Sequence, residues 1–468
     1  MKKFIKPDIV LINSNLEVDP PVAPIGLACL AGQIDRKKYF PHIIDLCLED
    51  NPKKELIFQL SKLKPLMIGV SVRNIFSGVP LQPKNYLRTV KKIIREIKKL
   101  TTAPIILGGA GFSIYPEEIL RATGVEYGII GEGEIPFVQF IEYLEKKRSL
   151  ADISSLIFLL NGKVHISKRI YDSVNKYKPP AFDLIDYKKY IKAGGYVAVQ
   201  TKRGCRFNCR YCTYPYLEGK NYRTKGVKQV VEEIKYLIER YDAKYFFFVD
   251  SVFSFPTNYA SGICQEIINQ GVQIAWMAYV NPRGITKNFA ELMKKSGCIG
   301  AELTTDSASE KMLVRLGKGF TGKEIQNSIE MLHKYRIPIA IHNIIGGPGE
   351  SLETVKETLS FYKRFPYVNA IFFNFGVALF RHSMFWEKYG NESYSVNKLR
   401  NQIYISPEIK KNLKLVHKMC LDLSNCDVTD LGYYSVISKF LFHDLMRKLK
   451  IYPVWKYNHF KGKLTRFL

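Results

Sequence analysis

Short apolar segments alternate with amphipathic helical patterns along most of the chain, and this alternation restricts the possible folds more than any other feature. In residues 1–150 the β-rich runs include DIVLINSNL (8–16) and APIILGGAG (103–111), and the helical patterns include VKKIIREIKKL (90–100). Strands that are apolar throughout and that alternate with helices are typical of a buried parallel sheet. The sequence therefore predicts an α/β fold that begins with a doubly wound, Rossmann-like domain over residues 1–150.

A second alternation begins at residue 196. Six strand–helix repeats joined by short links extend over residues 196–395 and predict a partial (β/α)6 barrel of TIM type. Residues 151–195 contain two short strand patterns and a pair of prolines, and we interpret them as a connector. Residues 396–468 are predicted to form a small helical region with a basic, aromatic tail.

The composition narrows the class of protein. The chain has 468 residues, 46% of them hydrophobic, and none of its apolar runs reaches the roughly 18 residues that cross a bilayer. The start, MKKFIKPDIV, lacks the apolar core and cleavage site of a signal peptide, so we expect a cytoplasmic protein. Many of the lysines behind the net charge of +27 alternate with Ile, Leu and Glu on helix faces, so we expect an anionic substrate, cofactor or membrane surface rather than nucleic acid.

The last segment, residues 440–468, contains seven Lys or Arg, one acidic residue and seven aromatic residues. Such a segment can lie on an anionic bilayer, which predicts peripheral contact with the inner face of the membrane. The alternative is that it covers the open side of the barrel or the cofactor.

Three of the nine cysteines are clustered in the loop TKRGCRFNCRYCTYP (201–215), with the spacing Cys205-x3-Cys209-x2-Cys212. Three thiolates can hold one metal centre but cannot complete a four-coordinate zinc site, and no Cys or His lies within the next 50 residues. A [4Fe–4S] cluster held by three cysteines leaves one iron open to a chelating ligand. An incomplete zinc site and unrelated thiols are the alternatives. The other cysteines are interpreted as small buried hydrophobes: Cys29, Cys47, Cys264, Cys298, Cys420 and Cys426.

The cysteine loop follows the first predicted barrel strand and resembles the loop of the radical SAM superfamily, and the resemblance extends over residues 196–380. It implies that the cluster passes one electron to S-adenosylmethionine (SAM) and generates a 5′-deoxyadenosyl radical. The resemblance also implies which residues bind SAM. An aromatic residue and the turn GGPGE would lie near the adenine, residues at the ends of two strands would hold the amino group and the ribose, and a basic residue would meet the carboxylate. The residues at these positions are Tyr211, Asp250, Ser251, Glu302, Lys318, Gly346, Gly347 and Pro348, with Arg223 as a second candidate for the carboxylate. For GGPGE, a tight turn before a helix is the alternative.

The first domain resembles the cobalamin-binding domain that precedes many radical SAM enzymes, through PPVAPIGLACLAGQI, GVSVRN, LGGAGFS and GIIGEGEIPF. No DxHxxG motif is present, and His42 is interpreted as a residue at the start of a strand, so cobalamin is expected to bind without a histidine ligand. A degenerate Rossmann unit is the alternative; a dinucleotide is not expected, because GGAG is not the GxGxxG of such sites. The candidate cobalamin residues follow the predicted strands: Ser71, Arg73, Asn74, Gly108, Gly109, Gly131, Glu132, Gly133 and Glu134.

Together the two resemblances are those of a class B radical SAM methyltransferase, and QTKRGC, CTYPYLEG, FVDSVFSFP, LGKGF and GGPGES are similar to a group associated with lipid, ladderane-type or natural-product pathways. They imply that the 5′-deoxyadenosyl radical removes a hydrogen atom from an unactivated carbon of a lipid or natural product. The substrate radical formed in this way then takes a methyl group from methylcobalamin. They also imply an external one-electron donor such as flavodoxin or ferredoxin. The sequence fixes no catalytic residue; the candidates for lining the substrate cavity are Tyr279, Asn281 and Asn374.

Three other functions stay open. A cyclase or rearrangement enzyme would use the same cofactors but add no methyl carbon. A tRNA methylthiotransferase would need three more cysteines upstream, where the first domain offers only Cys29 and Cys47. A non-enzymatic redox-sensing protein would bind a cluster without cleaving SAM.

Overall fold

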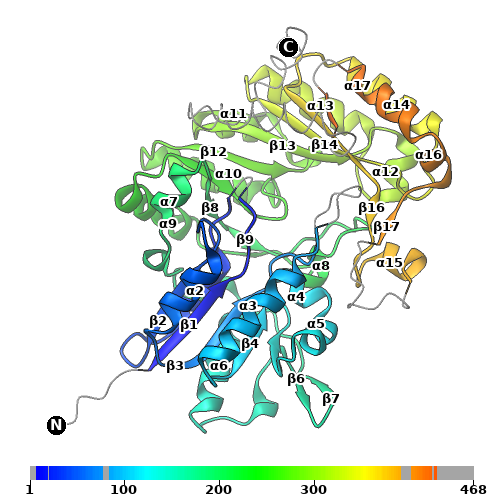
Figure 1. The fold of residues 1–468 in the computed structure, drawn as a ribbon. Coiled ribbons are helices and arrows are strands. Elements are labelled where there is room, and N and C mark those ends of the chain that lie inside the picture. Colours follow the sequence, from blue (N-terminus) through cyan, green and yellow to red (C-terminus); the bar gives the residue numbers. More distant parts are fainter. Residues whose placement is uncertain (1–6, 19–20, 77–83, 392–401, 424–425, 429–468) are drawn as a thin grey trace.

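Two seven-stranded sheets organise the protein. The structure is a computed structural model and describes residues 7–18, 21–76, 84–391, 402–423 and 426–428. In Figure 1 the N-terminal sheet, blue to cyan, lies below the second sheet, green to orange. The carboxyl-terminal ends of the first sheet's strands point toward the second unit.

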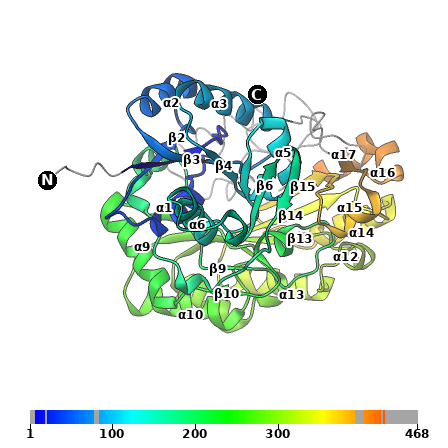
Figure 2. The ribbon, with the colours of Figure 1, turned by 90° about the horizontal axis from the view of Figure 1, so that it is seen from below.

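The N-terminal sheet has the order β2-β1-β3-β4-β5-β6-β7, and its first five strands are parallel. Helices cover both of its faces, which is why the strands carry apolar residues on both sides. One face packs on α2, α3 and α5 and the other on α1 and α6, and Figure 2 shows these two helical layers. The strands are β1 (Asp8–Asn13), β2 (Phe40–Asp45), β3 (Pro65–Ser71), β4 (Ile105–Gly108) and β5 (Tyr127–Ile129), and the helices are α1 (Ile25–Gln33), α2 (Pro52–Leu60), α3 (Leu87–Leu100), α5 (Pro116–Thr123) and α6 (Glu134–Leu144). The doubly wound prediction is confirmed.

The segment predicted as a connector adds two strands to this sheet. β6 (Leu156–Leu160) pairs antiparallel with β5, and β7 (Lys163–Ile166) pairs antiparallel with β6. These strands cover the edge that β5 would otherwise expose.

The second sheet has the order β18-β15-β14-β13-β12-β11-β8, and all its strands are parallel. The six predicted strands are present, so the predicted partial barrel is confirmed. They are β8 (Val197–Val199), β11 (Tyr245–Phe248), β12 (Ala275–Val280), β13 (Cys298–Asp306), β14 (Ile339–Ile345) and β15 (Ala370–Phe375).

Burial alternates along the barrel strands. One face of each strand joins the largest apolar core, which is shared with the outer helices α9 (Val227–Tyr241), α10 (Thr257–Asn269), α11 (Lys287–Lys295), α13 (Gly322–Lys334) and α14 (Leu352–Lys363). The opposite, inner face is more open: Phe247, Tyr279, His342 and Phe372 are all partly exposed. Because side chains alternate with a period of two, each strand packs the outer core and still presents side chains to the interior.

The C-terminal region differs from the helical prediction. Within the described part of residues 396–468 it contains α16 (Pro407–Lys411) and α17 (Leu413–Leu421), but also β17 (Ile403–Tyr404) and β18 (Cys426–Val428); β16 (Val377–Ala378), the partner of β17, and α15 (Met384–Tyr389) lie before this region. β18 pairs with β15 and extends the barrel sheet, which the sequence prediction missed. The basic, aromatic segment 440–468 lies outside the described residues. None of the helices in the described ranges combines the length and the apolar character needed to cross a membrane.

Buried ion pairs join the first sheet to the barrel. Two short strands that flank the cysteine loop, β9 (Lys202–Arg203) and β10 (Arg223–Thr224), pair antiparallel. The Arg223 guanidinium donates to both carboxylate oxygens of Glu132, with Nη1 at 2.8 Å from Oε2. The Arg203 guanidinium donates to Glu134 with N–O distances of 2.5 and 3.1 Å. The four side chains are between 4% and 14% exposed, so the pairs are shielded from water.

Arg223→Met is therefore expected to destabilise the protein by about 3–5 kcal/mol, because the change leaves the Glu132 carboxylate with one buried partner fewer. Replacing both residues, as Glu132→Gln with Arg223→Met, should recover a large part of that loss. Urea unfolding of the single and double variants measures the free energies. Additive losses in the double variant would contradict the predicted coupling.

Candidate active site

Backbone hydrogen bonds shape the cysteine loop. Gly204 adopts a left-handed φ of 92°, and a Cβ there would lie 2.1 Å from the Asn221 carbonyl oxygen, so only glycine fits before Cys205. The Cys205 amide donates to the Gly219 oxygen at 3.0 Å, and the Arg210 amide donates to the Leu316 oxygen at 2.9 Å. The loop is thus tied both to Gly219, directly after α8 (Tyr214–Glu218), and to the end of α12 (Glu310–Leu316).

The three clustered thiols lie in surroundings that disfavour free thiolates. Burial raises the pKa of Cys212 to about 12 and also raises the pKa values of Cys205 and Cys209. The Lys318 ammonium acts in the opposite direction on Cys209. A bound iron centre would supply the positive charge that buried thiolates need.

The described residues contain no group of three Cys, His, Asp or Glu side chains placed to hold a metal ion. A [4Fe–4S] cluster needs each of the three thiolates on a separate iron, and the residue types and the loop fit this arrangement.

A buried polar group lies next to Cys209. The Tyr211 hydroxyl donates to the Asp306 carboxylate, and the Lys318 ammonium donates to the same oxygen, Oδ2, at 2.5 Å. Tyr211 and Lys318 thus meet beside the cysteine loop through a carboxylate that sequence reasoning missed, and their roles in SAM binding stay predictions. The only sequence signal for Asp306 is its place at the carboxyl end of a predicted barrel strand.

Asp250 is engaged by neighbouring groups of the chain itself. Its carboxylate is buried and accepts hydrogen bonds from the Thr201 amide at 2.8 Å and from the Lys202 ammonium at 2.9 Å. These contacts fix the start of β9, and the role of Asp250 at the amino group of SAM stays a prediction. Ser251 lies beside the cysteine loop, where its hydroxyl donates to the Gly204 carbonyl at 3.3 Å.

Arg223, the second candidate for the SAM carboxylate, is likewise engaged by Glu132. Its role at the SAM carboxylate stays a prediction.

The glycine turn after β14 is held by its own glutamate. The amides of Gly346 and Gly347 donate to Glu350 Oε2 at 2.5 and 3.1 Å, and Pro348 is buried in the same turn. Both amides are satisfied within the chain, as the tight-turn interpretation predicts. Burial raises the pKa of the Glu350 carboxyl to about 7.

The structure brings Glu302 to Tyr279 rather than to the cysteines. Glu302 precedes Asp306 by four residues on β13, which corresponds to about 13 Å along a regular strand, and the register with β14 shifts between Thr304 and Asp306. Its carboxylate oxygen lies 3.0 Å from the ring nitrogen Nε2 of His342, on the inner face of the barrel. Asn374 lies on the same inner face of its strand and is partly exposed.

Asn281 proves to be a capping residue. Its side-chain oxygen accepts from the Arg283 amide at 3.0 Å at the start of the short helix η4 (Pro282–Gly284), and the residue is buried. This cap accounts for the side-chain oxygen of Asn281, and a place for Asn281 in the lining of the substrate cavity stays a prediction.

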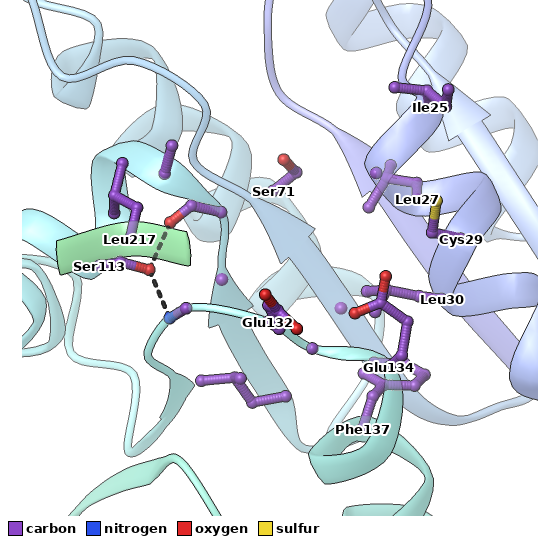
Figure 3. A pocket seen from close by; sticks show the side chains of 18 of the residues that line it. Ile25, Leu27, Cys29, Leu30, Ser71, Ser113, Glu132, Glu134, Phe137 and Leu217 are labelled. Carbon is purple, nitrogen blue, oxygen red and sulfur yellow. Dashed lines mark hydrogen bonds between the residues drawn. The ribbon is translucent and has the colours of Figure 1, made fainter. Parts of the chain in front are cut away.

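A cavity of about 310 Å³ lies at the carboxyl-terminal edge of the first sheet. Figure 3 shows Ser71, Ser113, Glu132 and Glu134 around it, together with Leu217 from the barrel unit. The Ser113 hydroxyl donates to the Gly109 carbonyl at 2.9 Å and accepts from the Gly131 amide at 2.8 Å, which joins two glycine turns. Seven of the predicted cobalamin residues line the cavity: Ser71, Gly108, Gly109, Gly131, Glu132, Gly133 and Glu134.

The shape and lining of this cavity fit cobalamin. No atom lies within 4 Å of a Cβ built on Gly26, and the nearest atom to one on Gly108 is 3.9 Å away, so the cavity extends to both backbones. Its walls are apolar along the strands, at Leu11 and Leu107, and charged at the rim. These properties suit a large cofactor with an apolar heteroaromatic part and a polar periphery. None of the described residues that line the cavity is a histidine.

Two predicted cobalamin residues lie elsewhere. Arg73 and Asn74 line a separate, smaller cavity with Asn15 and Tyr86, because the chain turns away from the sheet edge after Ser71. The grouping of Arg73 and Asn74 with the glycine turns is therefore corrected. His42 Nε2 lies 2.9 Å from Asp8 at the amino-terminal end of the strands, away from the cavity, as predicted.

Comparisons with known proteins agree with this geometry. Residues 199–362 match the Radical SAM superfamily, and residues 14–141 match the B12 binding domain. An uncharacterized methyltransferase from Pyrococcus horikoshii is 30% identical over 346 residues, which cover 73% of each chain. The chain belongs to the cobalamin-binding radical SAM enzymes. Its cofactors are a [4Fe–4S] cluster, SAM and cobalamin, and it is an enzyme of the methyltransferase type.

Two further relatives define the range of this group. The anaerobic magnesium-protoporphyrin IX monomethyl ester cyclase of Rubrivivax gelatinosus is 23% identical over 355 residues, 72% of this chain and 61% of the cyclase. A radical S-adenosylmethionine methyltransferase from Kitasatospora setae, solved with cobalamin and a [4Fe–4S] cluster, shares the fold with a TM-score of 0.85 at 19% identity, covering 99% of both chains.

Two further residues of this radical SAM enzyme connect the cobalamin cavity with the cysteine loop, and sequence reasoning missed both. Tyr214 and Glu218 lie on α8 (Tyr214–Glu218) and line the cavity. The Tyr214 amide lies 3.5 Å from Cys212 Sγ, and the Glu218 carboxylate accepts from the Gly204 amide at 3.1 Å. Burial raises the pKa of Glu218 to about 7. The only sequence feature that could have pointed to Tyr214 and Glu218 is their position shortly after the third cysteine of the motif.

Glu350→Gln is expected to make the stability of the protein less sensitive to a rise in pH from the acidic to the neutral range. The raised pKa of Glu350 means that the folded state favours the neutral carboxyl, so wild-type stability falls as pH rises from about 4.5 to about 7. The glutamine side chain of the variant cannot ionise. The difference in melting temperature, variant minus wild type, should therefore increase between pH 5 and pH 8. The exposed Glu353→Gln serves as the control, and a difference that does not change with pH would contradict the prediction.

Proposed function

We propose that the protein is a cobalamin-dependent radical SAM C-methyltransferase that methylates an unactivated carbon of a natural product or lipid. The observation that carries this proposal is the position of α8. Tyr214 and Glu218 line the cobalamin cavity, while the Tyr214 amide lies 3.5 Å from Cys212 Sγ. A cofactor bound in the first sheet and one bound at the cysteine loop would therefore meet across one helix turn.

When bound, the cluster with SAM supplies a carbon-centred radical, and cobalamin supplies a methyl group. The chain's own contribution is to place and enclose these groups. The ion pairs of Glu132 and Glu134 with Arg203 and Arg223 fix the sheet edge against the loop. Holding reacting groups in one water-poor space replaces encounters in solution and protects a radical from side reactions.

A second candidate function is cyclisation or rearrangement with the same cofactors. The similarity to the cyclase of Rubrivivax gelatinosus favours it, because that enzyme matches 72% of this chain. Product mass distinguishes the two functions, since methylation adds one carbon to the substrate and cyclisation adds none.

The remaining partners are proposed from the sequence. A small acidic electron carrier such as flavodoxin or ferredoxin would suit a chain with a net charge of +27. A cytoplasmic location, with contact to the membrane surface through the basic segment 440–468, is part of the same proposal.

Cys209→Ala is expected to abolish the bound cluster and 5′-deoxyadenosine formation, because two thiolates cannot hold a site-differentiated cluster. Iron and sulfide are quantified after anaerobic reconstitution, and 5′-deoxyadenosine is measured by chromatography. Cys264→Ala, in the apolar core, is the matched control and should retain both. A Cys209→Ala protein with about four irons and wild-type SAM cleavage would contradict the assignment.

A methyl-labelled SAM experiment tests the proposed transfer. The reconstituted enzyme, with cobalamin and a reductant, is incubated with extracts that contain candidate lipids and natural products. The label should appear in a product one methyl group heavier than its precursor. Label-free products of unchanged carbon count would favour the cyclase alternative, and SAM left intact would favour the redox-sensing alternative.

A further inference from the structure

A carboxylate, an imidazole and a phenol meet on the inner face of the barrel. Glu302 of β13 lies 3.0 Å from His342 Nε2 of β14. Tyr279 of β12 is the register partner of Glu302, and its hydroxyl hydrogen-bonds to the carboxylate, whose charge is the main cause that raises the pKa of the Tyr279 phenol. Three neighbouring strands thus hold one carboxylate between two polar rings. We name Tyr279, Glu302 and His342 the inner-wall cluster.

Aromatic rings continue this cluster along the wall. The ring centroids of Phe247 and Tyr279 are 5.4 Å apart, those of Tyr279 and His342 are 5.7 Å apart, and those of His342 and Phe372 are 4.9 Å apart. All four rings are partly exposed, while their neighbours on the outer face are buried. The rings therefore lie on the inner wall of the barrel with the carboxylate among them, and two of them, Phe247 and Phe372, also pack against a small buried apolar cluster.

The inner-wall cluster lies close to the cofactor sites. Tyr214, which lines the cobalamin cavity, is near enough to Tyr279 to contribute to the raised pKa of its phenol. Asp306, which meets Lys318 beside Cys209, follows Glu302 on the same strand. The cluster thus shares β13 with Asp306, which lies beside the cysteine loop, and has Tyr214 of the cobalamin cavity in its neighbourhood.

A purely structural role explains this arrangement poorly. Burying a carboxylate costs several kcal/mol in desolvation, and apolar residues of similar size would pack a barrel interior at less cost. Glu302 is only 7% exposed, yet its surroundings are rings that remain accessible. A buried carboxylate among partly exposed aromatic rings is suited to bind an organic cation, since ring faces and carboxylates both attract positive charge.

We infer that the inner-wall cluster binds the substrate through a protonated amine held by Glu302, with a planar part of the substrate against the rings of Phe247, His342 and Phe372. This inference rests on the proposed function and refines it: the substrate is an amine-bearing aromatic compound rather than a simple acyl lipid. The hydrogen bonds from His342 and Tyr279 orient the carboxylate toward the interior. The carbon to be modified would then lie between the cobalamin cavity and the cysteine loop.

Matched small probes test this class of substrate. Phenethylamine, 2-phenylethanol and 3-phenylpropionate carry the same ring with a cationic, neutral or anionic end. Equilibrium dialysis against the anaerobically reconstituted holoenzyme should show phenethylamine bound at least tenfold more tightly than the other two. Equal affinity for the three probes, tighter binding of 3-phenylpropionate, or no saturable binding of phenethylamine at millimolar concentration would overturn the inference.

Variants assign the effect to the cluster. Glu302→Gln keeps the shape and removes the charge, and it should weaken phenethylamine binding about tenfold; Tyr279→Phe should weaken it less. Glu239→Gln, exposed on α9, is the matched control and should bind like wild type. Cluster absorbance and cobalamin content of each preparation report whether the variants remain folded. Wild-type affinity in Glu302→Gln would overturn the inference.

The same preparations separate this inference from the proposed function. If wild type holds both metal cofactors and cleaves SAM but shows no preference for the amine, the substrate class is wrong and the proposed function stands. If wild type holds no cluster or no cobalamin, the proposed function itself fails.

Discussion

The ion pairs between the first sheet and the barrel are the interaction on which the rest of the site depends. Glu132 and Glu134 lie in the turn that bounds the cobalamin cavity, and Arg203 stands two residues before Cys205. Because these charges are buried, each carboxylate needs its guanidinium, and the turn and the cysteine loop are held in one relative position. The distance between the two cofactor sites is therefore set by four side chains rather than by a flexible linker.

The barrel uses the two faces of its strands for different purposes. The outer face supplies the apolar core under the helices, which stabilises the sheet. The inner face carries the polar and aromatic residues, including Glu302 and His342, that a core would not need. A parallel sheet stabilised from one side can keep such costly groups on the other side and place them near bound cofactors.

Polar residues at strand ends serve two needs that look alike in a sequence. Asp250 and Asn281 stand where functional groups are expected in a barrel, yet both satisfy nearby backbone or ammonium groups of the chain itself. Asp306 stands at an equivalent place and meets Tyr211 and Lys318 beside the cysteines. Residue type and position do not separate these cases, because the deciding fact is which groups from distant strands reach the carboxylate.

The sequence alone determined the two α/β units, the six barrel strands, the cysteine tripod and the glycine turns, because periodicity and short spacings are local properties of the chain. Only the tertiary structure decided that β6, β7 and β18 complete the sheets, that Arg73 and Asn74 leave the cobalamin cavity, and that Glu302 joins His342. These outcomes depend on strand order and on the direction of side chains from segments far apart in the chain. Such relations arise when the sheets pack, and no local pattern encodes them.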